Sequence, residues 1–427
     1  MTFCPRIRSP PLLSLFLAVG LIGGSSLLAV GLVPPLRPTS PVLPEELVSL
    51  NLRERGGGPR FPTHSVPVGT QPVYASYDSA SGEVYVSNFL SGNVSMLNGT
   101  SVAGTVPVGG DPYRSLFDPQ NGYVYVVNQA GYVSVLSGTQ VIDNVSVGTL
   151  PGGISLDGSN GLVYVVNSQS NNVSVLRGAR LLATVSVGVS PVGSTVDTAN
   201  GNVYVVNSLG GTVSVLNGTS LVATIPVGPE PFAATYDSSN GYVYVPCTHS
   251  LNVSVIKGTT IVATIPVGSA PVGRVAYDSM NGFVYVVTSQ GISVLNGTSL
   301  WATIPVDPYP EFPSYDRDSG YVYVSQPGSL TTPSNVSVLN GTALLTEVPV
   351  GISPAGPTTD LSDGYVYVPN QGSNNVTVIE PRFVPTQTTS ATGFLGLPGN
   401  VGYYLLGLAA TTVIVVAIIL VVRSRRR

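Results

Sequence analysis

The sequence predicts an all-β protein built from repeated units of four strands, and three observations support this. The stretch YVYVVN at 123–128 has close copies at seven other places in the chain. The motif VPVG and its variants begin at residues 66, 106, 145, 185, 225, 265, 304 and 348, spacings of 39 to 44 residues. No window of helical length and periodicity interrupts the repeats. A period near 40 residues indicates stacked supersecondary units rather than separate domains.

One unit, residues 231–268, shows what each repeat contains. It has four short runs rich in Val, Ile, Thr and Tyr, namely FAATY, YVYV, NVSVI and IVATIPV, each bounded by Asp, Asn, Ser or Gly. Such runs are typical of strands separated by turns. Four strands in each of several units of this length predict a β-propeller with four-stranded blades. YVYV is apolar at every position because neighbouring blades cover both of its faces.

The ends of the repeat region predict how the ring closes. The first VPVG, at 66–69, precedes the first complete unit, and the last unit ends after NVTVIE at Glu380 without an outer strand. We expect the N-terminal strand in THSVPVG to complete the last blade, which removes two exposed sheet edges. Eight blades are predicted, with seven as the alternative if one unit is displaced. The sixth unit is irregular, with an extra residue in PVGRVAYD.

The segments that flank the repeats predict a membrane protein. Arg6 and Arg8 precede an apolar run, so 1–33 is expected to be a signal peptide or an uncleaved signal anchor. Residues 401–422 carry no charge and predict a transmembrane helix, and the arginine-rich 423–427 predicts a cytoplasmic tail. Residues 34–62 and 381–400 are expected to be linkers. The chain would cross the cell membrane once, or twice with the signal retained, holding an extracellular propeller at 63–380.

The repeat motifs resemble those of a known family. The YVYVVN strands, NVSVLNGT hairpins and ATIPVG closing strands, over about residues 63–380, are similar to the YVTN β-propeller repeats of archaeal and bacterial surface proteins. The resemblance implies the propeller fold and an association with surface layers and extracellular binding. It implies no particular activity, because propellers carry many unrelated functions.

Two sets of polar residues recur once in each blade. An Asp ends each predicted first strand, and these carboxylates could bind calcium or could each form an Asx-turn. We expect turns, because one Asp per blade is too widely spaced for a shared ion. A second set follows the VYV strands, and we expect turn residues there too. The two sets are Asp78, Asp118, Asp157, Asp197, Asp237, Asp278, Asp316 and Asp360, then Asn88, Asn128, Asn167, Asn207, Cys247, Thr288, Gln326 and Asn370.

Few residues suit catalysis. His64, His249 and Cys247 have no partner beside them in the sequence, and no motif for nucleotide binding, a serine nucleophile or catalytic zinc appears. We therefore predict a protein that is not an enzyme and has no metal or cofactor. Arg114 and Arg274 fall in predicted innermost strands. They could bind an anionic ligand in the channel, or they could pair with a neighbouring Asp.

Ten sequons match the N-glycosylation pattern. Asn-Gly is also a favoured hairpin turn, so some matches could be accidents of the repeat. In an exported protein, asparagines on exposed loops accept glycans, and we expect several to be modified. The candidates are Asn93, Asn98, Asn144, Asn172, Asn217, Asn252, Asn296, Asn335, Asn340 and Asn375.

Charge and topology together suggest a function. Residues 64–380 contain 18 Asp or Glu and 6 Arg or Lys, which argues against nucleic-acid binding. The leading hypothesis is a non-catalytic, membrane-anchored, extracellular propeller that serves as a binding or envelope module for a protein or glycan partner. One alternative is an extracellular lyase or hydrolase, which would need Arg114, Arg274 and rim carboxylates to converge in the channel. A second is a structural surface-layer subunit.

Overall fold

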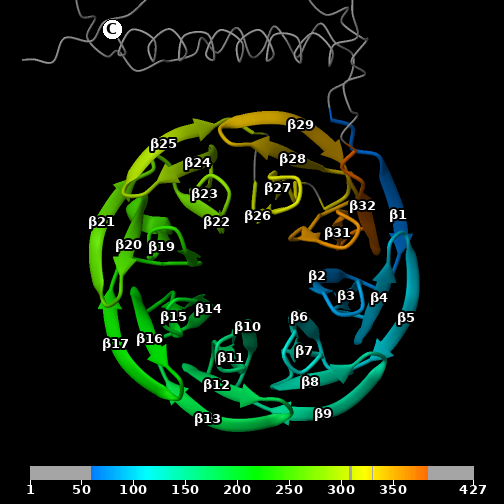
Figure 1. Cartoon of the computed structure of the whole chain (residues 1–427), viewed down its shortest axis with the longest axis horizontal. Coiled ribbons are helices and arrows are strands. Elements are labelled where there is room, and N and C mark those ends of the chain that lie inside the picture. The colour runs from blue at the N-terminus through cyan, green and yellow to red at the C-terminus, as the bar shows by residue number, and fades with distance from the viewer. Residues whose placement is uncertain (1–58, 307–309, 329, 383–427) are drawn as a thin grey trace, which may run out of the picture. The chain divides into compact units, whose positions relative to one another are not determined.

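Eight sheets form a closed ring in the computed structural model, which describes residues 59–306, 310–328 and 330–382 (Figure 1). We use the word channel for the region inside the innermost strands of this ring. Each sheet is a blade of four antiparallel strands. This confirms the predicted eight-bladed propeller and excludes the seven-bladed alternative. The predicted signal segment 1–33, the helix 401–422 and the tail 423–427 lie outside the described residues, as do most of the linkers 34–62 and 381–400. None of the helices within the described ranges is long and apolar enough to cross a membrane.

Blades 1 to 4 follow one another along the chain, each running from its innermost to its outermost strand. Blade 1 has β2 (Pro72–Asp78), β3 (Glu83–Asn88), β4 (Asn93–Asn98) and β5 (Ser101–Pro107). Blade 2 has β6 (Pro112–Asp118), β7 (Tyr123–Asn128), β8 (Tyr132–Ser137) and β9 (Gln140–Ser146). Blade 3 has β10 (Pro151–Asp157), β11 (Leu162–Asn167), β12 (Asn172–Arg177) and β13 (Arg180–Ser186). Blade 4 has β14 (Pro191–Asp197), β15 (Asn202–Asn207), β16 (Thr212–Asn217) and β17 (Ser220–Pro226).

Blades 5 to 7 keep this order, and blade 8 combines the two ends of the propeller. Blade 5 has β18 (Thr235–Asp237), β19 (Tyr242–Cys247), the short 3-10 helix η1 (Thr248–Ser250), β20 (Asn252–Lys257) and β21 (Thr260–Pro266). Blade 6 has β22 (Pro271–Tyr277), β23 (Phe283–Thr288), β24 (Gly291–Asn296) and β25 (Ser299–Ile304). Blade 7 has β26 (Phe312–Tyr315), β27 (Val322–Ser325), β28 (Asn335–Asn340) and β29 (Ala343–Pro349). Blade 8 has β30 (Thr358–Thr359), β31 (Val366–Asn370), β32 (Asn375–Ile379) and β1 (Thr63–Pro67).

The ring closes between β1 and β32, as the sequence predicts. The two strands pair antiparallel with Thr63 opposite Ile379, and they lie side by side in Figure 1. His64 Nε2 lies 2.9 Å from the Glu380 carboxylate, a contact between residues 316 positions apart. The hydrogen bond from Arg382, followed by the smaller effect of His64, lowers the pKa of Glu380. His64 therefore belongs to the closure of the ring.

The second strand of each blade supplies the core. In β15, Val203, Tyr204, Val205 and Val206 are all buried. Tyr204 and Val206 pack against blade 5, whereas Val203 and Val205 pack against blade 3. The strand is covered on both faces, so apolar side chains at successive positions stabilise the fold through burial. This is the physical reason for the repeated YVYV sequence.

A hydrogen bond from a tyrosine hydroxyl also joins neighbouring blades. The hydroxyl of Tyr204 donates to the carbonyl of Gly258, which lies in the outer hairpin of blade 5, at 2.9 Å. The hydroxyl of Tyr244 makes the same bond to Gly297 of blade 6 at 2.9 Å. The hydroxyl of Tyr285 makes this bond to Gly341 of blade 7, so the Tyr of the second strand ties blades 4, 5 and 6 each to the next blade.

Candidate functional site

The first strands show where the repeats stop being equivalent. In every blade this stretch of the sequence runs from a Pro to an Asp, so its positions can be compared between blades. The third position, counted with the Pro as the first, holds only Gly or Ala in blades 3, 4, 5, 6 and 8, at Gly153, Gly193, Ala233, Gly273 and Gly356. The same position holds Tyr74 in blade 1, Arg114 in blade 2 and Phe312 in blade 7. Because these strands are the innermost ones in Figure 1, the large residues lie on one part of the channel wall.

The large side chains meet one another across the channel. The guanidinium carbon of Arg114 lies 4.9 Å from the centre of the Tyr74 ring, and its Nη2 donates to the Tyr74 hydroxyl at 3.3 Å. Arg274, from blade 6, places its guanidinium carbon 5.0 Å from the same ring and also donates to the same hydroxyl. We call Tyr74, Tyr113, Arg114, Arg274 and Phe312 the channel cluster.

Aromatic contacts hold the channel cluster together. The rings of Tyr74 and Tyr113 meet edge to face with their centres 5.0 Å apart, and Phe312 meets Tyr74 edge to face at 6.4 Å. Arg274 lies 5.1 Å from the Phe312 ring as well. Both geometries are favourable for aromatic and cation–π contacts. The cluster thus joins blades 1, 2, 6 and 7.

An insertion in blade 6 brings Arg274 into the cluster. In blade 2, Pro112 pairs with Asn128 and Ser115 pairs with Val126. In blade 6, Pro271 pairs with Thr288 but Val275 pairs with Val286, so β22 has one more unpaired residue than β6. The backbone N–H of Arg274 leaves the ladder and donates to the carbonyl of Glu311 in blade 7 at 3.0 Å. A β-bulge of this kind redirects side chains, and here it directs Arg274 toward its neighbour's side of the channel.

The two arginines have no acidic partner among the residues that the structure describes. Neither makes an ion pair, and the Nε atoms of both are buried without a hydrogen-bond partner. A guanidinium carries several N–H donors, so most of them are unused here. Pairing with a neighbouring Asp, the second interpretation of these arginines from the sequence, is thus not seen among the described residues.

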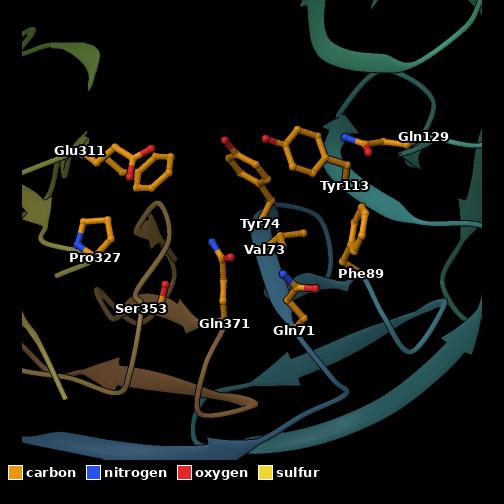
Figure 2. Close-up of a pocket in the computed structure, with 11 residues that line it drawn as sticks. Gln71, Val73, Tyr74, Phe89, Tyr113, Gln129, Glu311, Pro327, Ser353 and Gln371 are labelled. Atoms are coloured by element: carbon orange, nitrogen blue, oxygen red, sulfur yellow. The ribbon is translucent and has the colours of Figure 1, made fainter. Parts of the chain in front are cut away.

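A cavity of about 390 Å³ opens beside the cluster, near the beginnings of the first strands. Tyr74, Tyr113, Phe89 and Phe312 form its aromatic part. Figure 2 shows Glu311 on one side, Tyr113 and Gln129 on the opposite side, and Tyr74 between them. Further polar groups come from the remaining lining residues, among them Gln71, Gln371 and Ser353.

Among the described residues that line this cavity, Glu311 is the only one with a carboxylate. Burial raises its pKa, since a desolvated carboxyl group favours the neutral form. Burial is also the main cause that raises the pKa of Tyr113, and the nearby Tyr74 and Glu311 add to it. Both groups can therefore serve as proton donors in hydrogen bonds over a wider pH range than they would in water.

The eight Asp residues lie at the other end of the first strands and form turns. In every blade the Asp Oδ1 accepts the backbone N–H two residues later, as Asp78 does from Ala80 at 2.8 Å and Asp157 from Ser159 at 3.0 Å. This confirms the Asx-turn interpretation. Over the described ranges, no group of three or more His, Cys, Asp or Glu could hold a metal ion. The rim carboxylates thus do not converge with the arginines.

The second polar set was expected in turns, and that expectation is wrong for the Asn members. Asn88 is buried, and its Nδ2 donates to Ser95 at 2.9 Å and to Asn93 at 2.8 Å. Asn167, Asn207 and Asn370 make equivalent pairs of bonds. These side chains tie the second strand to the third because a buried amide needs partners.

The remaining residues that could take part in catalysis lie elsewhere. Cys247 is buried, and burial raises the pKa of its thiol, which disfavours a thiolate nucleophile. His249 lies in the exposed η1 and places Nδ1 2.9 Å from the Glu230 carboxylate. Neither residue lines the cavity.

The sequon asparagines fall into two groups. Asn98, Asn217, Asn296 and Asn340 end the third strands at exposed hairpins, and Asn144 is exposed on β9. Asn93, Asn172, Asn252, Asn335 and Asn375 begin the third strands and are half-buried. The Nδ2 of Asn375 donates to Ser65 of the closing strand at 2.9 Å. Whether any of them carries a glycan stays a prediction.

Sequence reasoning singled out Arg114 and Arg274 but missed Tyr74, Tyr113, Glu311 and Phe312. A usable signal was present in the sequence, because the third position counted from the Pro is Gly or Ala in five blades and large in the other three. What the sequence did not show is that Arg274, displaced by the bulge, reaches Tyr74 across the channel.

Comparison with known proteins shows the fold. No family model matches the chain, and no curated protein does. Hydrazine synthase from Kuenenia stuttgartiensis is 19% identical with a TM-score of 0.53, and 74% of this chain matches 98% of that one. The dihydro-heme d1 dehydrogenase NirN in complex with DHE is 15% identical with a TM-score of 0.55, over 74% of this chain and 75% of its own.

A third similar structure is a streptogramin B lyase. It is 13% identical with a TM-score of 0.53, over 75% of this chain and 98% of its own. At such low identity, these likenesses show a shared architecture and no shared chemistry. The chain is a β-propeller, and its resemblance to the YVTN repeats stays a prediction.

Proposed function

We propose that the protein is a membrane-anchored, extracellular propeller that binds a small ligand at the mouth of its channel and does not catalyse a reaction on it. The observation that carries the proposal is the asymmetry of the repeat. Blades 3, 4, 5, 6 and 8 hold Gly or Ala where blades 1, 2 and 7 hold Tyr, Arg and Phe. The propeller fold therefore does not need large residues at this position, yet they converge beside one cavity.

The cavity has the properties of a ligand site. Its volume of about 390 Å³ is within the range of small-molecule pockets. Aromatic rings supply flat apolar walls, while Glu311 and the glutamine amides supply a few oriented polar groups. Aromatic rings next to several hydrogen-bonding groups suit a ligand that has both a flat apolar part and polar ends.

The binding proposal is tested by a thermal-shift screen of small organic acids, amines and sugars on the full chain in detergent. Hits are then titrated by calorimetry. Gln129→Ala, in the cavity wall, is expected to weaken a true ligand about tenfold, which is the typical effect of removing a buried hydrogen-bond partner. Gln140→Ala, on the exposed outer strand of the same blade, is the matched control and should change nothing. Equal effects of the two variants on every hit would contradict the proposal.

Membrane anchoring is a separate part of the proposal and has its own test. Removing residues 401–427 should release the protein from isolated membranes, while the full chain stays with them. Release of both forms by a salt wash, or retention of both, would contradict anchoring by this segment.

An enzymatic function is the second candidate, and Glu311 is the observation that favours it. Its pKa is raised by burial, and the two phenols of Tyr74 and Tyr113 line the same cavity. A carboxyl group with a raised pKa suits general acid catalysis. If a ligand of the screen is turned over, Glu311→Gln should abolish turnover but keep binding. A screen in which every bound ligand is recovered unchanged supports the binding module.

A further inference from the structure

We propose that Arg114 and Arg274 form a site for an anionic oxygen group, a carboxylate or a phosphate, and that the Tyr74 hydroxyl occupies this site when no ligand is bound. The inference rests on the proposed function, since it names the chemical class of the ligand that the channel mouth takes. The inference adds a charged subsite next to the cavity, and it assigns the Tyr74 hydroxyl as the group that occupies this subsite without a ligand.

The charge arrangement is the first argument. Two guanidiniums donate to a single neutral phenol oxygen, and both have buried Nε atoms without partners. Like charges held close together and partly desolvated oppose folding unless an anion compensates them. In the described part of the chain neither arginine forms an ion pair. An oxyanion between them would supply the missing charge and accept several of the unused N–H groups.

The insertion in blade 6 is the second argument. Arg274 stands on a bulge that is longer by one residue than the corresponding bulge of β6. Blade 4, whose first strand begins PVGSTVD, folds without such an insertion. The extra residue brings a second positive charge to a place that already holds Arg114. Structural packing alone does not account for this, whereas bidentate recognition of an oxyanion from two sides does.

Tyr74 connects the arginines with the cavity. Its side chain lines the cavity, and both guanidiniums lie near its ring. Its hydroxyl is the one side-chain acceptor in the described residues to which both arginines donate. A carboxylate or phosphate oxygen accepts a stronger, charge-assisted hydrogen bond from a guanidinium than a phenol does. A ligand that enters from the cavity would therefore displace the hydroxyl and take its donors.

The rest of the cavity indicates what the ligand carries besides the anion. Glu311 and the amides of Gln71, Gln129 and Gln371 line the cavity. Glu311 accepts hydrogen bonds when ionised, and its raised pKa lets it donate when protonated. The ligand class is thus a small organic acid or phosphate ester whose other end bears amine or hydroxyl groups.

The test uses the full chain in detergent, with inorganic phosphate and acetate as probes at constant ionic strength. Phosphate is expected to raise the Tm of the wild type and to titrate by calorimetry. Arg114→Gln and Arg274→Gln should each weaken phosphate at least tenfold, because each removes a charge-assisted partner. Arg317→Gln is the matched control, since Arg317 is exposed at the turn end of blade 7. It should leave phosphate binding unchanged.

Tyr74→Phe gives the readout that a general charge effect would not produce. Removing the hydroxyl removes the competitor for the arginine donors, so phosphate should bind about threefold to tenfold more tightly. Circular dichroism verifies that each variant is folded, and an arginine variant that does not fold is replaced by Arg114→Met or Arg274→Met, which also removes the charge.

The proposal is overturned if neither probe binds the wild type, if both arginine variants bind as the wild type does, or if Tyr74→Phe binds no more tightly. The two proposals can fail separately. If a ligand from the screen needs Gln129 but neither arginine, the result supports the proposed cavity function and contradicts the anion site. If phosphate binding needs the arginines but the Gln129 variant weakens no ligand of the screen, the result supports the anion site and contradicts the proposed cavity function.

Discussion

Arg274 and Tyr74 are 200 positions apart in the chain, and the guanidinium of the first lies 5.0 Å from the ring centre of the second. The contact runs from blade 6 to blade 1, past blades 7 and 8 in the ring. It exists because the ring is closed, with β1 completing blade 8, and because a bulge turns Arg274 out of its own ladder.

Deleting Arg274 tests whether the inserted residue of blade 6 serves the anion site or the folding of the propeller. The shortened strand would read PVGVAYD, which resembles the first strand of blade 4, so the propeller is expected to fold. Phosphate should then bind at least tenfold more weakly, as it does for a lost charge-assisted contact. Circular dichroism and calorimetry measure the two outcomes. A folded deletion variant with unchanged phosphate binding would show that Arg274 has no part in the site.

Two tyrosines at equivalent positions should respond differently to loss of their hydroxyl. Tyr204 donates to the Gly258 carbonyl at 2.9 Å, whereas the buried hydroxyl of Tyr164 has no hydrogen-bond partner among the described residues. Tyr204→Phe should lower the free energy of unfolding by about 1 kcal/mol, the usual worth of such a bond. Tyr164→Phe should be neutral or stabilising, because it removes an unsatisfied buried group. Denaturant titration measures the free energy of unfolding of both variants. A larger decrease for Tyr164→Phe than for Tyr204→Phe would contradict this prediction.

Features that recur in every blade could be predicted from the sequence, whereas features that occur only once in the ring could not. YVYV, the Asp before each turn and the spare N-terminal strand predicted the blades, the Asx-turns and the closure, because each depends on local chemistry repeated around the ring. The channel cluster is different. Which side chain faces Tyr74 depends on the order of blades around the closed ring, and the direction of Arg274 depends on a single inserted residue. The asparagines that follow the VYV motif were expected in turns because Asn is common there. Asn88 is instead buried, and its side chain donates a hydrogen bond to Ser95.

Glu311 should make stability depend on pH in a defined direction. Burial raises its pKa in the folded protein, so the folded state binds more protons than the unfolded state between the ordinary glutamate pKa and the raised value. In that window stability falls as pH rises, and above the raised pKa the loss is complete. Glu311→Gln removes the ionisation, so its stability relative to the wild type should increase with pH through this window. Thermal unfolding of both proteins from pH 4 upward, about the ordinary pKa, measures the difference. A constant difference would contradict the burial of this carboxyl group.

Glycan occupancy should follow exposure. Asn98, Asn144, Asn296 and Asn340 are exposed, and we expect them to be the sites most open to a glycan. Asn217 is exposed too, but its Nδ2 donates to the side chain of Asn202 at 2.9 Å, so we expect lower occupancy there. Asn375 uses its Nδ2, the atom that a glycan would occupy, to bond Ser65 of the closing strand. Peptide mapping by mass spectrometry of protein isolated from membranes should find the exposed sites occupied more often. Full occupancy of Asn375 in folded protein would contradict this expectation.

The most direct test of the central claim is a crystal structure of the full chain with phosphate, paired with one of the same crystals without it. The account predicts phosphate oxygens within hydrogen-bond distance of both guanidiniums, Arg114 and Arg274, and a Tyr74 hydroxyl that has left its place between them. Without phosphate, the hydroxyl should lie between the arginines as described here. A Tyr74 hydroxyl that keeps both arginines in the presence of saturating phosphate, with no anion in the channel, would contradict the account.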